Sequence, residues 1–233
     1  MFKKIIFSAL LVSVMGWTGQ KSDASICLFL SADSNFDNSE VIVFDNQLAG
    51  YTQNGWTSTH DDANMTLGAA VYNGSAAGFD VAVSTAASKP LLVGNQIDLN
   101  SVVLGTGEIF VGMYDYGFVD NGLGFYSQIG GTTQGAVTLG TFVDFDPAED
   151  LNFSPVYLSE DLDQSPFADS NQTNLAGSSS TQTEFGMAVV VNVVHDKWNI
   201  SSFDASFAQT PEPTTALIWS VMAGMGLVVR RRR

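Results

Sequence analysis

Side chains that commonly carry catalysis are few in this chain of 233 residues. It has two histidines, His60 and His195, whereas a catalytic zinc site usually needs three protein ligands, often mostly histidine. The single cysteine, Cys27, excludes an intrachain disulfide and a cysteine-based zinc module. No Gly-x-Ser-x-Gly sequence, glycine-rich phosphate loop or dinucleotide fingerprint occurs. We therefore predict no catalytic residue, no cofactor and no enzymatic activity. A secreted hydrolase, combining a histidine with paired carboxylates, is an alternative.

Carboxylates are the next candidates, because calcium takes six to eight oxygen ligands from flexible loops. One group lies at the end of a predicted strand and consists of Asp144, Asp146, Glu149 and Asp150. A second group lies in a polar segment and consists of Glu160, Asp161 and Asp163. The calcium loop of an EF-hand is absent, and Pro147 interrupts the first group. We interpret both groups as solvated acidic loops and keep the first as the alternative calcium site.

Aromatic side chains offer a different chemistry, since an exposed ring can stack on a sugar. Aromatic residues in strands more often belong to the core or to cross-strand pairs. Carbohydrate binding is therefore an alternative function, and its candidates are Tyr51, Trp56, Tyr114, Tyr116 and Tyr126.

The charge pattern restricts the partners. Between Ser25 and Ala208 the only cations are Lys89 and Lys197, against 22 acidic residues, a net charge of −20. Such a surface repels phosphate backbones, so we exclude nucleic-acid binding.

The segment 25–209 has the pattern of an all-β domain. Short apolar or alternating runs are bounded by Gly, Asn and Asp, and no sustained helical period occurs. About nine antiparallel strands are expected to form a β-sandwich or jelly roll. The predicted strands are Glu40–Asp45, Met65–Tyr72, Phe79–Thr85, Gln96–Leu104, Glu108–Tyr116, Gly124–Ile129, Ala136–Phe145, Phe185–Val194 and Trp198–Phe207.

Turn residues and one long segment complete this prediction. Asn73-Gly74, Asn121-Gly122 and Gly130-Gly131 are typical of hairpin corners, and His195-Asp196-Lys197 is expected to link the last two strands. The polar segment 146–182 is long for a structureless loop. We expect it to hold one or two short strands, or to be a surface excursion where binding resides.

The N-terminus has the pattern of a signal peptide over residues 1–24. Lys3 and Lys4 precede an apolar run, Ile5 to Trp17, that is short for a membrane span. Small residues at −3 and −1 predict cleavage by signal peptidase after Ala24. Because Ile26 is too large for a lipobox, we interpret Cys27 as a small apolar residue on the first strand.

The C-terminus, residues 210–233, has three parts. Pro211-Glu212-Pro213 is followed by an apolar stretch, Thr214 to Val229, and by Arg230, Arg231, Arg232 and Arg233. The prolines keep their segment extended, and the apolar stretch would span about 24 Å as a transmembrane helix. The arginines hold the C-terminus in the cytoplasm.

This tail resembles the PEP-CTERM sorting signal of Gram-negative bacteria, whose signature is Pro211-Glu212-Pro213. The resemblance implies recognition by exosortase, a membrane-embedded protease. It also implies passage through the inner membrane to the outer surface or the exopolysaccharide matrix. The same segment is also labelled after ice-binding proteins that carry it, a label that describes only the tail.

The body resembles uncharacterised ectodomains of PEP-CTERM proteins. The matching residues are Lys89-Pro90, Ile97 to Val102, Asp115 to Phe118, Gly130 to Thr132 and Ser202 to Ala205. We therefore expect an exported surface or matrix protein without activity of its own. A carbohydrate- or calcium-dependent adhesive module is the alternative, and a hydrolase or an ice-binding protein are weaker ones.

Overall fold

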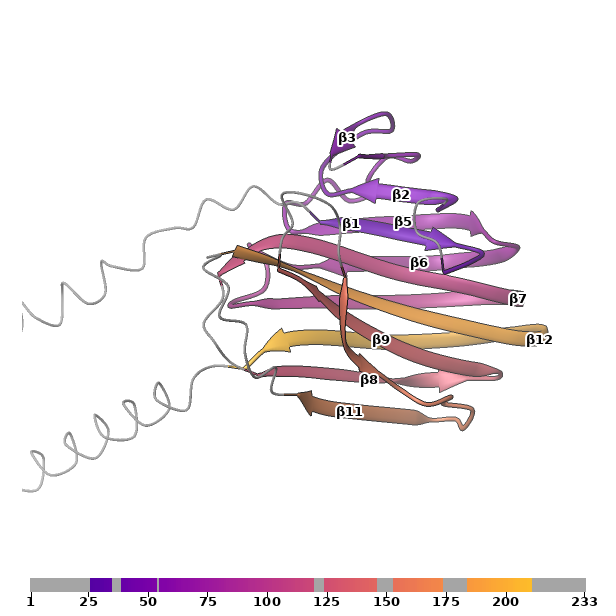
Figure 1. Ribbon diagram of the computed structural model, residues 1–233. Coiled ribbons are helices and arrows are strands. Elements are labelled where there is room, and N and C mark those ends of the chain that lie inside the picture. Colours follow the sequence, from indigo (N-terminus) through magenta and orange to yellow (C-terminus); the bar gives the residue numbers. More distant parts are fainter. Residues whose placement is uncertain are drawn as a thin grey trace, which may run out of the picture.

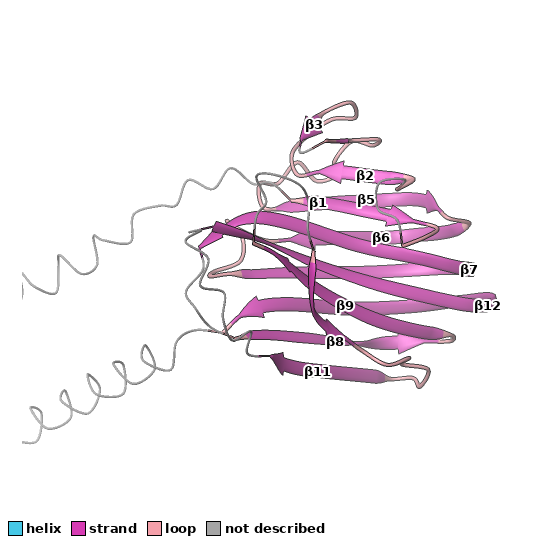
Figure 2. Ribbon diagram, in the orientation of Figure 1, coloured by secondary structure: helices cyan, strands magenta, loops and turns pink. Residues whose placement is uncertain are grey.

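The computed structural model describes residues 26–34, 39–53, 55–119, 124–145, 153–173 and 184–210. In this part of the chain all regular structure is β, as Figure 2 shows. The strands are β1 (Cys27–Ser31), β2 (Val41–Phe44), β3 (Thr52–Gln53), β4 (Trp56–Thr57), β5 (Ala69–Ala76), β6 (Phe79–Ala87), β7 (Gln96–Val119), β8 (Phe125–Thr133), β9 (Ala136–Asp144), β10 (Ser154–Leu158), β11 (Phe167–Thr173) and β12 (Glu184–Gln209).

Two long strands organise the fold. β7 and β12 pair antiparallel from one end to the other, with a register shift between His195 and Asn199 opposite Gly105 and Gly107. The chain changes direction at this register shift, which we call the corner. There both strands reach the right-hand side of Figure 1 and turn back. Gly107 has a φ of 103°, which a residue with a side chain rarely adopts. The corner thus folds one ten-stranded sheet into two layers.

The two halves of β7 and of β12 pair with different strands. The first layer has the order β10-β9-β12-β7-β1-β2 and uses the C-terminal half of β7 with the N-terminal half of β12. The second layer has the order β11-β8-β12-β7-β6-β5 and uses the other two halves. Every pairing is antiparallel, so the expectation of an all-β antiparallel sandwich is confirmed.

The core lies between the layers and follows the strand period of two. Alternate residues of β12, before and after the corner, have their side chains in the core. They form one apolar cluster with residues of β1, β6, β7, β8 and β9. Phe203, Ala205 and Phe207 point inward, as their alternation predicts. The run from Met187 to Val191 is buried throughout, because apolar clusters lie on both faces of the first layer there.

Some predicted boundaries were wrong. Gln96–Leu104 and Glu108–Tyr116 belong to one strand, as do Phe185–Val194 and Trp198–Phe207, because the ladder continues around the corner. His195-Asp196-Lys197 lies in that corner and links no hairpin. Asn73-Gly74 lies inside β5 at a register shift, and Gly130-Gly131 lies inside β8. Tertiary pairing has overridden these local turn preferences.

The long polar segment contains the strands β10 and β11, which extend the two layers at their edges. The expectation of one or two short strands in this segment is confirmed, and β11 lies at the surface. The short strands β3 and β4, which form a hairpin, and β11 are not among the strands that the sequence predicts.

The two chain ends fall outside the described residues. These include the predicted signal peptide with its predicted cleavage site after Ala24, the Pro211-Glu212-Pro213 sequence, the predicted transmembrane segment and Arg230 to Arg233. Within the described ranges, no helix is long and apolar enough to cross a membrane.

Candidate functional site

A hollow of about 670 Å³ lies on the outer face of the second layer. It is formed by β8, β11 and β12, and its lining includes Tyr126, Gln128, Gly130, Ala168, Asp169, Ser170 and Asp204. Its size falls within the roughly 300–1,000 Å³ that is common for small-molecule sites. In Figure 1 these three strands lie together in the lower part of the sandwich.

The floor of the hollow is made of small residues. Gly130 pairs with Ala168 on β11 and with Asp204 on β12, so these three form one row across the sheet. A Cβ atom added at Gly130 would meet only the Phe167 carbonyl oxygen, at 3.8 Å. A larger side chain at position 130 would therefore project into the hollow and fill it.

The polar side chains of the hollow make few bonds inside the protein. In the described part of the chain, the side chains of Tyr126, Gln128 and Ser170 have no hydrogen-bond partner. Ser206 on β12 pairs with Gln128 on β8, two residues along from the pair of Asp204 and Gly130, so its side chain lies on the same face. The hollow therefore combines an aromatic ring with hydrogen-bonding groups that a ligand can use.

The row of Gly130, Ala168 and Asp204 has a second carboxyl group, that of Asp98, next to Asp204. Asp204 pairs with Asn100 on β7, and Asp98 is two residues before Asn100, so Asp98 and Asp204 are diagonal neighbours on one face. Burial raises the pKa of Asp98 to about 6, and the charge and hydrogen bond of Asp204 add to this shift. Neither residue was a predicted site residue, although the alternation of Ser202 to Phe207 places Asp204 outward.

The rim of the hollow is held by a contact between the layers. The Tyr157 hydroxyl on β10 donates to Asp169 Oδ2 on β11, which joins the edges of the two layers. Burial raises the pKa of Tyr157 to about 12, and the hydrogen bond to Asp169 adds to this effect. The phenol therefore stays protonated and keeps donating at neutral pH.

The predicted aromatic platform divides between the two layers. Tyr126 lies in the hollow, whereas Tyr51, Trp56, Tyr114 and Tyr116 lie on the outer face of the first layer. There they pack on one another: Trp56 meets Phe29 at 5.7 Å, and Tyr114 stacks on Tyr116 at 6.3 Å between ring centroids. Trp56, Tyr114 and Tyr116 belong to a second, smaller core, in agreement with the view that strand aromatics usually pack. Tyr51 is 37% exposed and packs edge-on against Phe44 at its margin.

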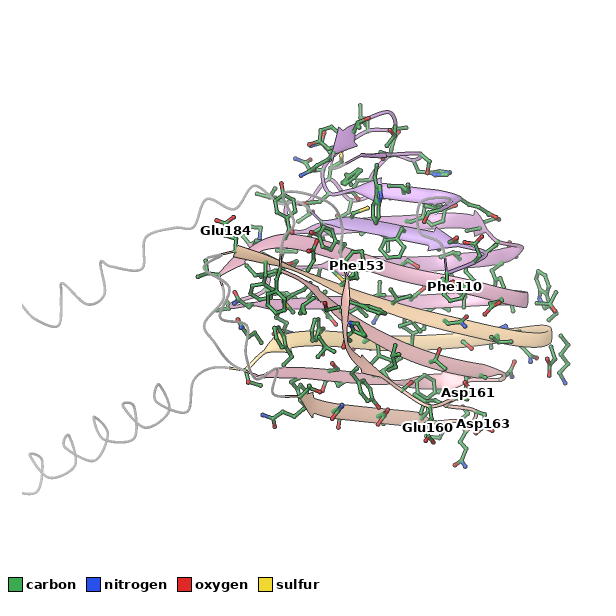
Figure 3. All side chains as sticks on the ribbon, in the orientation of Figure 1. Phe110, Phe153, Glu160, Asp161, Asp163 and Glu184 are labelled. Carbon is green, nitrogen blue, oxygen red and sulfur yellow. The ribbon has the colours of Figure 1, made fainter. Side chains whose placement is uncertain are left out.

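Phe110 and Phe153 extend this second core on the same face, as Figure 3 shows. Cys27 lies beneath it, 1% exposed on β1, which confirms its interpretation as a small apolar residue. Burial raises the pKas of the Cys27 thiol and the Tyr114 hydroxyl.

The predicted calcium ligands do not meet in the part of the chain that the structure describes. Asp144 is fully buried at the end of β9, whereas Asp146, Glu149 and Asp150 fall outside the described residues. The second acidic group lies at the turn between β10 and β11, at the opposite end from Glu184; Figure 3 labels Glu160, Asp161 and Asp163 there. No described group of three or more His, Cys, Asp or Glu side chains could hold a metal ion.

The two histidines have separate structural roles. His60 is exposed; its Nδ1 lies 2.8 Å from Thr59 Oγ1, and its ring packs on Tyr72. His195 is 1% exposed at the corner, with Nδ1 3.0 Å from the Gly105 carbonyl and Nε2 2.8 Å from Ser201 Oγ. Since the carbonyl can only accept, Nδ1 donates to it, and in the neutral imidazole Nε2 then accepts from Ser201. This pair ties the two arms of β12 together below the surface.

No protein-family model matches this chain, and no curated protein matches it. Similar solved structures include a carbohydrate-binding module described as CBM4, with a TM-score of 0.33 and 13% identity over 61% of this chain and 95% of that one. TmCBM61, in complex with β-1,4-galactotriose, has a TM-score of 0.31 and 7% identity, over 61% and 88% of the two chains. A family 11 module from Clostridium thermocellum, in complex with a mixed-linked tetrasaccharide, has a TM-score of 0.31 and 13% identity, over 65% and 95%.

Proposed function

We propose that this protein is a polysaccharide-binding module and that the hollow on the outer face of the second layer is its binding site. The observation that carries this proposal is the combination of the Tyr126 ring with unpartnered polar side chains around a small floor. A sugar ring has an apolar face that can stack on an aromatic ring and hydroxyl groups that need hydrogen-bond partners. The hollow supplies both.

The rival site is the aromatic face of the first layer. Its rings are largely used for packing against each other, and the Tyr116 hydroxyl accepts a hydrogen bond from Gln53 Nε2 at 3.0 Å. Burial of aromatic rings in such a cluster stabilises the fold and leaves less ring surface for a ligand. The hollow is therefore the better candidate.

Affinity electrophoresis in gels that contain defined polysaccharides tests this proposal. We expect Tyr126→Ala to weaken retardation about tenfold in apparent Kd, which corresponds to about 1.4 kcal/mol. Gly130→Leu should abolish retardation by filling the hollow while leaving the melting temperature nearly unchanged, because its Cβ would make only an ordinary van der Waals contact, with the Phe167 carbonyl oxygen. Tyr116→Ala is the matched control on the other face. If Tyr116→Ala removes binding and Tyr126→Ala does not, the assignment of the site is wrong.

We further propose that the protein is exported and sorted by exosortase to the cell surface or the exopolysaccharide matrix. The support is the C-terminal order of Pro211-Glu212-Pro213, an apolar stretch and four arginines, together with the N-terminal signal pattern. Processing by signal peptidase and exosortase, and a transient stay in the inner membrane, follow from this proposal.

Mass spectrometry of protein recovered from the cell surface tests the sorting proposal at both ends of the chain. We expect an N-terminus at Ser25 and loss of the arginine-rich tail. Deleting residues 211–233 should prevent delivery to the surface, whereas replacing the arginines with lysines keeps the charge and provides a control. An unchanged surface level after the deletion would contradict sorting and leave the polysaccharide proposal intact.

A further inference from the structure

Exposed apolar side chains gather at the end of the sandwich opposite the corner, where β12 ends at Gln209, on the left in Figure 1. They come from the loop before β5, the loop between β6 and β7, and the end of β7. These side chains, which we call the apolar end patch, are Leu67, Leu91, Val93 and Val119. Val93 is 89% exposed, the highest fraction among the large apolar residues that the structure describes as exposed. Exposed apolar patches often mark contacts with another surface.

Hydrogen bonds hold this patch beside the last residue of β12. The backbone N–H of Gln209 donates to the Asn95 carbonyl oxygen at 2.8 Å. Asn95 Nδ2 donates to Gln209 Oε1 at 2.6 Å and to the Val119 carbonyl oxygen at 2.7 Å. The same loop packs closely on Gly68, where an added Cβ atom would lie 2.9 Å from Pro90 Cδ. The apolar end patch is therefore fixed at the end of the sandwich where β12 stops.

The connection from this end to the predicted transmembrane segment is short. Thr214, the first residue of that segment, follows Gln209 by five residues, which span at most about 18 Å even when fully extended. Asn199, at the corner, lies ten residues before Gln209 along β12, a distance of about 33 Å in a strand. When the segment 214–229 enters a bilayer, the short connection therefore holds the apolar end patch, and not the corner, within reach of the bilayer surface.

The charges of the domain favour a bilayer surface without net charge. Lys89, the lysine of the loop between β6 and β7, is already paired with Asp115, with Nζ 3.0 Å from Oδ2. Between Ser25 and Ala208 the net charge is −20, so anionic headgroups would repel the domain. A zwitterionic surface exerts no such repulsion, and apolar side chains gain free energy when they leave water there.

We infer that the apolar end patch docks on a zwitterionic lipid surface while the protein is held in the membrane, with Leu91 and Val93 in the headgroup region beside the end of β12. This inference rests on the proposed export through a membrane-held stage, and it adds the surface that orients the domain on the bilayer. The strands then point away from the bilayer, so the hollow on the outer face of the second layer stays accessible to polysaccharide.

Fluorescence quenching tests this inference with the full chain in phosphatidylcholine vesicles that contain nitroxide-labelled lipid. An environment-sensitive dye is attached to Val93→Cys, to Asp196→Cys at the exposed corner, or to Ser220→Cys in the apolar stretch. Cys27 is 1% exposed, so the wild type should take up little dye. We expect the dyes at positions 93 and 220 to lose more than about half of their fluorescence, because apolar groups docked at an interface lie about 5–10 Å deep. The dye at position 196 should keep its fluorescence.

A charged substitution separates docking of the patch from simple tethering by the tail. Leu91 is 50% exposed, so Leu91→Asp should leave the fold intact. We expect it to reduce the quenching at position 93 about twofold or more, because a carboxylate resists transfer out of water. Leu158→Asp, on β10 and at a side chain that is 64% exposed, is the matched control and should leave the quenching unchanged.

The outcomes separate the inference from the proposed function. If the dye at position 220 is quenched and the dye at position 93 is not, the membrane-held stage stands, the inference is wrong, and a protein becomes the better partner for the patch. If Leu91→Asp has no effect, the tail alone explains the proximity, which also overturns the inference. Equal quenching at positions 93 and 196 would mean that the domain has no preferred orientation, with the same consequence. If the dye at position 220 is not quenched, the membrane-held stage itself fails, and the inference fails with it.

Discussion

The ion pair between Lys89 and Asp115 offers the sharpest test of the packing between the β6–β7 connection and the first layer. Asp115 is fully buried, and its Oδ2 accepts from Lys89 Nζ at 3.0 Å and from Ser88 Oγ at 2.6 Å. The Lys89 ammonium also lies 4.0 Å from the centroid of the Phe118 ring and donates to the Tyr116 carbonyl. Asp115→Asn keeps the shape but leaves the lysine charge without its counter-ion.

Breaking one side of a buried pair typically costs about 3–5 kcal/mol, because the remaining charge is desolvated without compensation. We expect Asp115→Asn to lower the free energy of unfolding by that amount, a large share of the roughly 5–15 kcal/mol of a typical domain. In Lys89→Met the fully buried carboxylate loses its counter-ion but keeps its bond from Ser88, so we expect a loss of similar size. The double variant should lose less than the sum of the two single variants.

Urea denaturation followed by tryptophan fluorescence measures these values, with a double-mutant cycle for the coupling. We expect a coupling of about 2 kcal/mol or more between positions 89 and 115. Asp196→Asn, an exposed change of equal charge, should alter stability by less than about 0.5 kcal/mol. Strict additivity of the two changes, or a cost of Asp115→Asn no larger than that of Asp196→Asn, would refute the reasoning.

Three further predictions concern the two faces and the corner. Burial raises the pKa of Asp98 to about 6, so folding favours its protonated form. The contribution of Asp98 to the free energy of unfolding is therefore full below about pH 4 and is lost as the pH rises through about 6. Melting temperatures at pH 4 and pH 7 should therefore differ less in Asp98→Asn than in the wild type, and parallel curves would contradict this. Gly112→Ala should destabilise by about 1–3 kcal/mol, because its Cβ would lie 2.2 Å from the Phe29 ring, whereas Gly130→Ala should be nearly neutral in the same chemical denaturation. His195→Phe should lower stability by about 1–3 kcal/mol by leaving the Gly105 carbonyl unpaired, and an unchanged unfolding midpoint would argue against the bond between them.

The predictable part of the candidate site is the direction of its side chains. Alternation over Ser202 to Phe207 is enough to place Phe203 inward and Asp204 outward, because a strand has a side-chain period of two wherever it pairs. Asp98 could not be recognised as its neighbour, since that depends on the register between β7 and β12, two strands far apart in the sequence. The same applies to Tyr126, which is one of five aromatic candidates until β11 closes the hollow beside it.

The sequence by itself determined the class of the fold and the inward direction of Phe203, Ala205 and Phe207, because these depend on local composition and periodicity. Only the tertiary structure decided that one continuous ladder turns the corner at His195 and that Gly130 lies within a strand. Long-range strand pairing sets both of these, and local turn preferences are too weak to oppose it. For the same reason, the hollow emerges only when β8, β11 and β12 lie side by side.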